Sequence, residues 1–406
     1  MGWATAHPPD PAGVATCIQC GLCLPSCPTF RLTGREDQSP RGRITAMAAV
    51  ADGAELDGTV AEMLDTCLGC RACEAACPSL VPYGELIEAA RVETSQVSGS
   101  KARSSLLANV LPSKGLLGTA TLGARVAQGF GSWVVPGKLR TGFDGLRPLS
   151  GRPDRFKGGT WEPEGEPVAT VGLLTGCVMD EWFRAVHEAT VTVLVAAGYR
   201  VVAPEAQTCC GALSAHDGDR ETAVDLATRN VPVFEGFEFI VSNSAGCGAH
   251  LEGYGHLVEG GDSVAARAVD VTELVAVSID EGRLPSFEGV EPVAIQDPCH
   301  LRHAQRVVEE PRAVVRAAGY RPVEIDPAGI CCGAAGTYSV LHPETSKALG
   351  GSKADQVRSS KAAIVASANP GCELQLRGHL GGDARVAHPV ELYAESLVAD
   401  GYRPGR

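Results

Sequence analysis

CIQCGLCLPSCP at residues 17–28 and CLGCRACEAACP at residues 67–78 are the stretches of this 406-residue chain that decide its fold. Each stretch spaces four cysteines as C-x2-C-x2-C-x3-C and ends in a proline. Cysteines this close together rarely all find disulfide partners of acceptable geometry, whereas their thiolates can converge on one metal centre. The two stretches therefore predict a metal-binding domain over residues 1–95.

The spacing of both stretches is that of bacterial ferredoxins, which bind [4Fe–4S] clusters. Three thiolates of one loop reach three irons, while the fourth lies beyond a turn that the proline stiffens and serves the neighbouring cluster. Zinc is the alternative, but zinc sites usually hold two separated C-x-x-C pairs. We therefore predict two [4Fe–4S] clusters, the first ligated by Cys17, Cys20, Cys23 and Cys77 and the second by Cys67, Cys70, Cys73 and Cys27.

The segment between the two stretches is longer than a minimal ferredoxin needs. Cys27 and Cys67 are 40 positions apart, and apolar residues recur at helical spacing over residues 43–51 and 60–64. This pattern predicts an α-helical two-cluster ferredoxin domain. Arg41 and Arg43 lie in the same segment, where they either offset the negative charge of reduced clusters or form a solvated basic turn.

Residues 96–165 differ in composition, because they contain no cysteine and are rich in Gly, Ser, Pro and basic residues. Leu106, Leu107, Val110 and Leu111 suggest one short amphipathic helix, and residues 146–160 (LRPLSGRPDRFKGGT) have the composition of a linker. We expect the apolar residues to pack against the neighbouring domains, with docking on a partner or a membrane surface as the alternative.

An internal repeat begins at residue 166. Cys177 and Cys209 are 32 positions apart, as are Cys299 and Cys331, and both pairs end in Cys-Cys-Gly. Ala-Ala-Gly-Tyr-Arg occurs at residues 196–200 and again at 317–321. Short apolar strands alternate with helical segments, which predicts two homologous α/β modules with mostly parallel sheets, at 166–285 and 286–406. The expected strands are residues 168–176, 199–204, 237–244, 292–298, 320–326 and 363–370, and the expected helices include 181–197 and 300–318. The fold class is thus α+β and multidomain.

Each module supplies four cysteines that follow a strand or open a helix, at the sheet edge where α/β proteins bind ligands. We expect them to form a further cofactor site, with additional iron–sulfur clusters as the leading identity; buried apolar thiols or a vicinal disulfide are the alternatives. His300 and His303 follow Cys299 at helical spacing and are candidates for a proton or quinone site, or else bond the start of the helix. The cysteines are Cys177, Cys209, Cys210, Cys247, Cys299, Cys331, Cys332 and Cys372.

Several classes of protein are disfavoured by composition and by the motifs that the sequence lacks. The net charge of −13 gives no electrostatic footprint for nucleic acid. Residues 1–16 have no basic or apolar region of a signal peptide, and no run of 18 residues is apolar enough for a spanning helix. We therefore expect the reducing cytoplasm as the location. No Gly-x-Gly-x-x-Gly fingerprint follows a strand, so we expect any flavin to sit on a partner chain.

The motifs together resemble the iron–sulfur subunits of glycolate oxidase, within the heterodisulfide reductase-related, Cys-Cys-Gly family. Beyond the ferredoxin stretches, the resemblance is carried by QTCCGALSAHDGD, SNSAGCGAHLEGYG, DPCHLRHAQ, CCGAAGTYSVLHPE and SANPGCELQL. It implies an electron-transfer subunit with no catalytic residues of its own. A partner FAD subunit would oxidise glycolate to glyoxylate, and this chain would pass the electrons to a quinone or another acceptor. The resemblance also allows peripheral contact with the inner face of the cell membrane.

The sequence departs from heterodisulfide reductase subunits at two positions. In those proteins the last motif of each module is C-x-x-C, whereas here the second positions are His250 and Gln375. A four-cysteine cluster, or a site with His250 as a ligand, remains open. The alternative functions are an iron–sulfur subunit of a lactate or glycerol-3-phosphate dehydrogenase complex, a heterodisulfide reductase-like thiol/disulfide oxidoreductase, and a zinc-stabilised scaffold.

Overall fold

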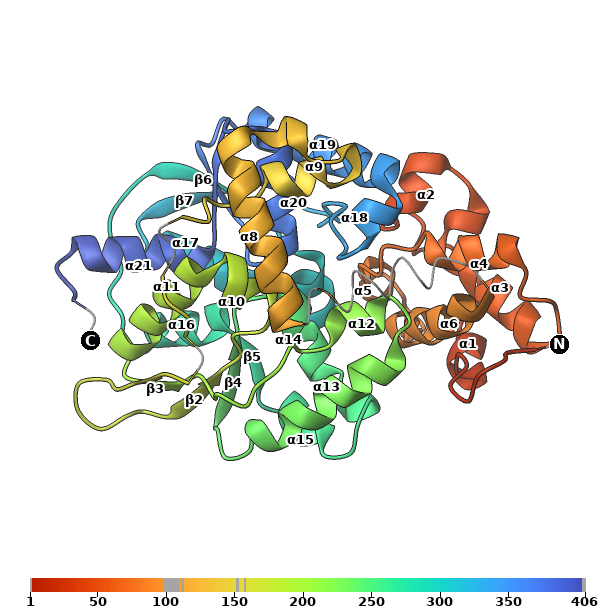
Figure 1. Ribbon diagram of the computed structural model, residues 1–406, viewed down its shortest axis with the longest axis horizontal. Helices are drawn as coiled ribbons and strands as arrows, with labels where there is room; N and C mark the ends of the chain where they lie inside the picture. Colours follow the sequence, from red (N-terminus) through yellow and green to blue (C-terminus); the bar gives the residue numbers. More distant parts are fainter. Residues whose placement is uncertain (1, 98–109, 111–112, 151–152, 157, 404–406) are drawn as a thin grey trace.

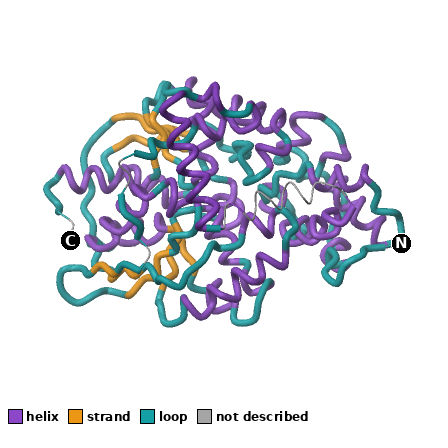
Figure 2. The backbone as a smooth tube through the Cα atoms, viewed as in Figure 1, coloured by secondary structure: helices purple, strands orange, loops and turns teal. Residues whose placement is uncertain are grey.

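The computed structural model describes residues 2–97, 110, 113–150, 153–156 and 158–403. A helical N-terminal domain lies at one end of the molecule, and two small sheets lie one above the other towards the opposite end (Figures 1 and 2). The chain termini are at opposite ends of the long axis (Figure 1).

The N-terminal domain consists of short helices whose starts are fixed by capping residues. The Ser39 side chain accepts a hydrogen bond from the Gly42 amide, and Pro40 occupies the first helical turn. Asp57 caps the next helix in the same way. Both helices confirm the periodicity in the sequence. The elements are α1 (Pro11–Ala15), α2 (Pro28–Thr33), η1 (Glu36–Gln38), α3 (Pro40–Ala51), α4 (Gly58–Asp65), α5 (Ala72–Ala75) and α6 (Tyr83–Val97).

The middle segment lies against both modules rather than hanging between them. Leu117 and Thr121 are buried on the inner side of the first long helix, where the Trp182 indole donates to the Thr121 hydroxyl at 2.9 Å. No helix of the described residues is both long enough and apolar enough to cross a membrane. The short helix expected around Leu106–Leu111 lies outside the described residues except for Val110. The elements are α8 (Lys114–Phe130), η2 (Ser132–Val134), α9 (Gly137–Asp144) and β1 (Thr160–Trp161).

The two modules repeat one topology, which confirms the internal repeat. The first sheet has the order β1-β3-β2-β4-β5 and the second the order β7-β6-β8-β9, with parallel pairing throughout except at the added edge strand β1. Numbered within a module, both orders are 2-1-3-4. The strands are β2 (Thr170–Leu173), β3 (Arg200–Val202), β4 (Phe239–Ser242), β5 (Ala268–Asp270), β6 (Glu291–Ile295), β7 (Tyr320–Glu324), β8 (Ile364–Ala366) and β9 (Arg385–Ala387).

Helices from both modules form one layer between the two sheets. Four of them pack against each other across the module boundary and bury a single shared core that includes Val193, Val275, Val314 and Tyr393. These four are α11 (Arg184–Ala196), α16 (Val271–Asp280), α17 (Glu309–Ala317) and α21 (Pro389–Ala399). The others are α10 (Val178–Trp182), α12 (Ala212–His216), α13 (Arg220–Val233), α14 (Ala245–Glu252), η3 (Tyr254–His256), α15 (Gly261–Ala265), η4 (His300–Gln305), α18 (Tyr338–Leu341), α19 (Pro343–Ser360) and α20 (Pro370–Leu380).

The predicted elements are largely confirmed, with three differences. All six expected strands are present, but a fourth strand in each module, β5 and β9, was not predicted, because each has only two consecutive apolar residues between charged or polar ones. The helix expected over 300–318 is broken: η4 is a π-helical turn, and Arg306 in the left-handed region separates it from α17. The linker 146–160 ends in β1, which pairs with β3 ahead of the module boundary expected at residue 166.

Candidate metal centres

The first cysteine set lies close to the protein surface. Cys20 is exposed, and Cys17 and Cys23 are half-buried. Burial raises the pKa of the Cys23 thiol, and the charges of Cys17 and Cys20 raise it further because the three thiols are close together. Cys77, from the second stretch, packs on the same apolar cluster as Cys17 and Cys23. Cys67 and Cys73 belong to this apolar cluster too, so the role of Cys77 as the fourth ligand of the first iron–sulfur cluster stays a prediction.

The second cysteine set is buried. Cys67, Cys70 and Cys73 have little exposed surface, and so has Cys27 from the first stretch. Burial raises the pKa values of Cys70 and Cys73 well above the usual range, and the charge of Cys27 adds to this rise in both. Cys27 therefore lies with the second stretch, as the crossed ligand pattern predicts.

A buried cation lies beside this second set. Arg43 is 1% exposed and donates from Nε to the Met63 carbonyl at 2.7 Å. Although burial raises the pKa of the Cys67 thiol, the charges of Arg43 and Arg91 outweigh it, so the pKa is lowered. Arg41 instead pairs with Glu36 at 2.5 Å near the surface. Arg41 also donates to the Gln19 carbonyl at 3.3 Å, and the Glu36 carboxylate and then the Cys23 and Cys20 thiols raise the pKa of its guanidinium. Both arginines are thus placed to offset negative charge, Arg43 beside the buried second set and Arg41 near the surface beside the first.

The eight module cysteines lie at the carboxyl edges of the two sheets. In each module the central strands are the pair at which the strand order reverses, and this is the usual ligand site of open α/β sheets. The Sγ atoms of Cys177 and Cys209 are 3.3 Å apart, and those of Cys332 and Cys372 are 3.1 Å apart. All sixteen cysteines are free, so neither vicinal pair forms a disulfide.

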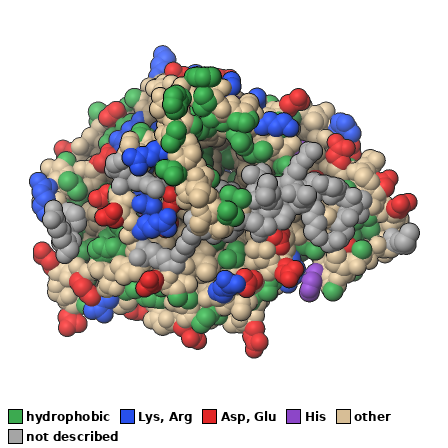
Figure 3. Space-filling view, in the orientation of Figure 1, with side chains coloured by type: hydrophobic (Ala, Val, Ile, Leu, Met, Phe, Trp, Pro, Cys, Tyr) green, Lys and Arg blue, Asp and Glu red, His purple; other side chains and the backbone are tan. Residues whose placement is uncertain are grey.

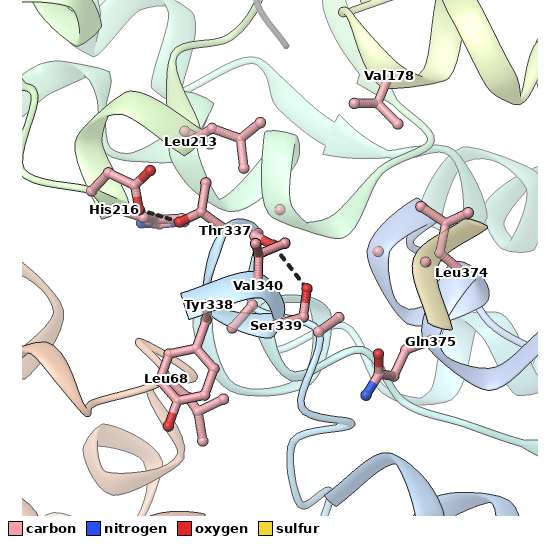
Figure 4. Close-up of a pocket in the computed structure, with 18 of the residues that line it drawn as sticks. Leu68, Val178, Leu213, His216, Thr337, Tyr338, Ser339, Val340, Leu374 and Gln375 are labelled. Carbon is pink, nitrogen blue, oxygen red and sulfur yellow. Dashed lines mark hydrogen bonds between the residues drawn. The ribbon is translucent and has the colours of Figure 1, made fainter. Parts of the chain in front are cut away.

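Both module sets face one cavity of about 950 Å³. Its walls come from both modules, from α8 and α9, and from the ferredoxin loop at Cys67 and Leu68. In Figure 4 Leu213 and His216 lie on one side of the cavity and Leu374 and Gln375 on the other, with the turn at Thr337–Val340 between them. The ferredoxin domain, the middle segment and both modules therefore all contribute walls to this cavity.

The buried ferredoxin set adjoins this cavity through the second module. Cys70 and Leu68 pack in one apolar cluster with Cys331 and Tyr338. The charge of Cys299 also contributes to the raised pKa of Cys70, after burial. The cysteine sets consequently form a continuous series, from exposed Cys20 through the buried second set to the cavity.

The structure separates the two candidate histidines. His300 lines the cavity, and its Nε2 is 2.9 Å from the carbonyl oxygen of Gly69. Burial lowers the pKa of His300 to about 4. His303 is not among the residues that line the cavity, and its Nε2 lies 3.0 Å from the Gly329 carbonyl oxygen.

Sequence reasoning did not single out His216 and Glu88. The His216 ring lies 5.2 Å from the His300 ring, and its Nδ1 is 2.8 Å from a carboxylate oxygen of Glu88. His216 sits in the QTCCGALSAHDGD motif, which could have drawn attention to it. Glu88 lies on α6, 128 positions earlier, and no sequence signal joins the two residues.

Comparison with known proteins assigns the parts of the chain and its family. Residues 13–81 match a 4Fe-4S dicluster domain, and residues 171–252 and 293–377 each match a cysteine-rich domain. The chain is 34% identical to the probable glycolate oxidase iron-sulfur subunit of Bacillus subtilis, covering 95% of both chains. It is 30% identical to the glycolate oxidase iron-sulfur subunit of Escherichia coli, over 94% of this chain and 93% of that one. The chain belongs to the glycolate oxidase iron-sulfur subunit family.

A third protein similar to this chain is named for a different activity. It is a subunit of the fumarate reductase (CoM/CoB) of Methanothermobacter marburgensis, 28% identical over 93% of this chain and 71% of that one. The family assignment and the domain matches agree with the predicted fold class and with iron–sulfur cofactors.

The donor groups of this family member fit iron–sulfur clusters. The eight N-terminal cysteines are free thiols, and the buried Cys67 among them has Arg43 beside it to offset negative charge. His250 is not among the residues that line the cavity; its Nε2 is buried with no hydrogen-bond partner among the described residues, and the charge of Cys209 acts on its ring. Gln375 instead donates to the Ser346 carbonyl at 2.9 Å. The two positions that depart from C-x-x-C therefore differ: only His250 has a free donor atom.

Proposed function

We propose that this chain is the electron-transfer subunit of a glycolate-oxidising complex. A separate FAD-binding subunit would oxidise glycolate to glyoxylate, and this chain would pass the electrons to a quinone or another acceptor. The observation that carries the proposal is the series of cysteine sets from exposed Cys20 to the cavity. When bound, the clusters would supply one-electron carriers along this series.

The chain's own residues support such a role in three ways. Cys17, Cys20, Cys23 and Cys77 would hold the outer cluster, and Cys67, Cys70, Cys73 and Cys27 the inner one. Arg43 supplies a buried positive charge beside the inner set. His300 and Tyr338 bond the Gly69 and Thr66 carbonyls, which fixes the inner loop against the second module. A fixed loop keeps the distance between the inner set and the cavity constant.

The test is glycolate-driven reduction of the chain in its complex. The chain is co-expressed with its flavin subunit, purified without oxygen, and mixed with glycolate while the iron–sulfur absorption is followed. We expect bleaching with glycolate but not with lactate or glycerol 3-phosphate. Cys70→Ser should stop electrons from reaching the acceptor, while Val290→Ser, a remote exposed change, should have no effect. Bleaching by lactate alone would overturn the substrate, and a colourless zinc-loaded chain would overturn electron transfer.

A second candidate function is reduction of a disulfide or a related thiol substrate in the cavity. It is favoured by the eight cysteines that line one cavity of about 950 Å³, and by the relative whose name includes CoM/CoB. Gln375 counts against it, because this hydrogen-bonded side chain stands where the C-x-x-C motif of heterodisulfide reductase subunits has its second cysteine. A purified complex that reduces a small disulfide, and loses this activity in Cys332→Ser, would favour this function over the first.

A further inference from the structure

The elements α8, η2 and α9 form an exposed apolar surface. Trp133 is 77% exposed and Phe130 is 66% exposed, values unusual for aromatic side chains. Figure 3 shows hydrophobic side chains gathered on the upper part of the molecule over these elements. We call this the α8–α9 surface; its exposed large apolar residues are Leu116, Leu122, Val126, Phe130, Trp133, Val134 and Leu139.

The packing of α8 explains why this surface is left over. Leu117 and Thr121 are on the buried face, against the first module. Leu122, Val126 and Phe130 follow one another at intervals of four, so they form a second apolar row on another face of the helix. Because the buried face already supplies the packing, the outer row contributes nothing to the fold of the described residues.

The charge of the same segment is opposite to that of the chain. Residues 94–143 contain six basic residues and no acidic one, although the chain carries a net charge of −13. Arg125, Lys138 and Arg140 are exposed beside the apolar row. None of the three forms an ion pair with an acidic residue within the part of the chain that the structure describes. The basic charge is therefore available to an anionic partner.

We propose that the α8–α9 surface docks on a membrane that contains anionic lipids. Exposed aliphatic side chains with a tryptophan and a phenylalanine, flanked by Lys and Arg, are the composition of helices that lie in the lipid headgroup region. The basic side chains add attraction to anionic headgroups, about 1 kcal/mol each. α8 has only 17 residues and is not apolar all round, so it would lie on the surface of the bilayer.

Docking through this surface would also place the cavity next to the membrane. Leu139 belongs both to the exposed surface and to the cavity wall, and Val135 lines the cavity next to Val134. The cavity wall therefore continues into the α8–α9 surface. The inference goes beyond the proposed function and does not depend on it, because binding to lipid needs neither glycolate nor an acceptor.

The experiment is flotation with vesicles, using the full-length chain co-purified with its flavin subunit. One vesicle type is phosphatidylcholine alone, and the other contains added phosphatidylglycerol. We expect binding to the anionic vesicles that weakens with salt. The variant Arg125→Gln/Lys138→Gln/Arg140→Gln should weaken it about 100-fold, from about 1 kcal/mol per basic residue. Phe130→Ser/Trp133→Ser should also weaken binding, whereas the control changes Val290→Ser and Arg229→Gln, exposed elsewhere, should leave it unchanged.

Three results would overturn the proposal: no binding to either vesicle, equal binding to both, or binding that the α8–α9 variants leave unchanged. Loss of the co-purified flavin subunit in these variants, with vesicle binding intact, would instead assign the surface to a protein partner. Dye reduction with glycolate in the same preparations separates this outcome from a failure of the proposed function.

Discussion

At the scale of single residues, the charge of Arg43 is the clearest adaptation to a cluster. A guanidinium that is 1% exposed is costly unless it meets opposite charge, and the hydrogen-bond acceptors around it are neutral oxygens of Met63, Thr29 and Thr66. The nearby thiols of Cys27 and Cys67 provide that opposite charge when they ionise. We therefore expect the stability of the N-terminal domain to depend on the ionised, metal-binding form of these thiols.

Arg43→Gln is expected to lower the iron content and to destabilise the N-terminal domain by about 3 kcal/mol, the usual cost of leaving a buried charge unpaired. Without the cation, the pKa of Cys67 rises and the thiolate needed for ligation becomes less available. Iron per chain and chemical unfolding measure the two effects. Arg35→Gln, an exposed arginine paired with Asp37, is the matched control. Unchanged iron content in Arg43→Gln would contradict the prediction.

His187 predicts how stability depends on pH. It is fully buried; its Nε2 donates to the Thr175 carbonyl at 3.1 Å, and its Nδ1 accepts from Asn243 at 2.9 Å. Burial lowers the pKa of His187 to about 4, below the ordinary value of 6.5. The unfolded chain therefore binds the proton more readily, and stability falls as the pH decreases from about 6.5 to about 4. The loss for this residue is about 3 kcal/mol at the acid limit.

Urea unfolding at a series of pH values tests this, with His187→Gln expected to give a shallower loss of stability in acid. His250, His300 and His388 have pKa values lowered to about 4 in the same direction, so part of the loss persists in the variant. The exposed His256→Gln serves as control. If the free energy of unfolding fell equally steeply with decreasing pH in His187→Gln and in the wild type, the prediction for His187 would be contradicted.

At the scale of elements, the Cys-Cys-Gly turns set the position of the module thiols. Gly211 and Gly333 have φ of +94° and +84°, which residues with a Cβ rarely adopt. A Cβ on Gly333 would also lie 2.7 Å from the Ser346 carbonyl oxygen and 2.9 Å from Leu349 Cβ. The glycine therefore permits both the turn and the close approach of α19 to the vicinal cysteines.

Gly333→Ala is expected to destabilise the second module by about 2–4 kcal/mol, combining left-handed strain with a steric clash. It should also reduce metal bound at the module site, because Cys331 and Cys332 move with the turn. Gly381→Ala is the control, since Gly381 has φ of +59° and no atom within 4 Å of its added Cβ. The control should cost only the strain, about 1 kcal/mol. Equal melting temperatures for the two variants would disprove the packing argument.

The sequence predicted the elements that are determined by neighbouring residues, but not the contacts between residues far apart in the chain. Apolar runs such as residues 168–176 and 292–298 indicate buried parallel strands from the sequence alone. The repeat then predicted that all eight module cysteines follow a strand or open a helix. The strands β5 and β9 were missed because each has only two consecutive apolar residues between charged or polar ones, which is too short a run to indicate a strand. The break after η4 depends on Arg306 in the left-handed region, for which arginine has no preference. The contact of Glu88 with His216 joins separate domains, so only the tertiary fold creates it.

At the scale of the whole molecule, the ferredoxin domain is held by contacts that converge on its inner cysteine loop. Arg91 donates to the His216 carbonyl at 2.8 Å and also to the Cys67 carbonyl. Tyr338 donates to the Thr66 carbonyl at 3.2 Å. One module therefore holds the loop through Arg91 and the other through Tyr338. The shared helix layer fixes the modules to each other, so all the cysteine sets belong to one rigid arrangement.

The middle segment completes this arrangement through Arg147, which contacts both modules. Its Nε lies 2.6 Å from Glu373 and its Nη1 2.5 Å from Glu391, both in the second module, while its guanidinium stacks over the Phe183 ring of the first. Glu373 is almost fully buried. Arg147→Met would leave two acidic groups close together without the cation that bonds both of them, although Arg377 lies 4.0 Å from Glu373. Such a loss costs about 3–5 kcal/mol.

The decisive measurement is a comparison of Arg147→Met with the triple variant Arg147→Met/Glu373→Gln/Glu391→Gln in urea unfolding. If the cost comes from unpaired buried charge, the triple variant should recover most of the stability, because neutral amides need no cation. Arg200→Met, which breaks an exposed pair with Glu162, should change little. If the triple variant were as unstable as the single one, Arg147 would act by packing on Phe183 instead, and the ion pairs would not be what fastens the middle segment to the modules.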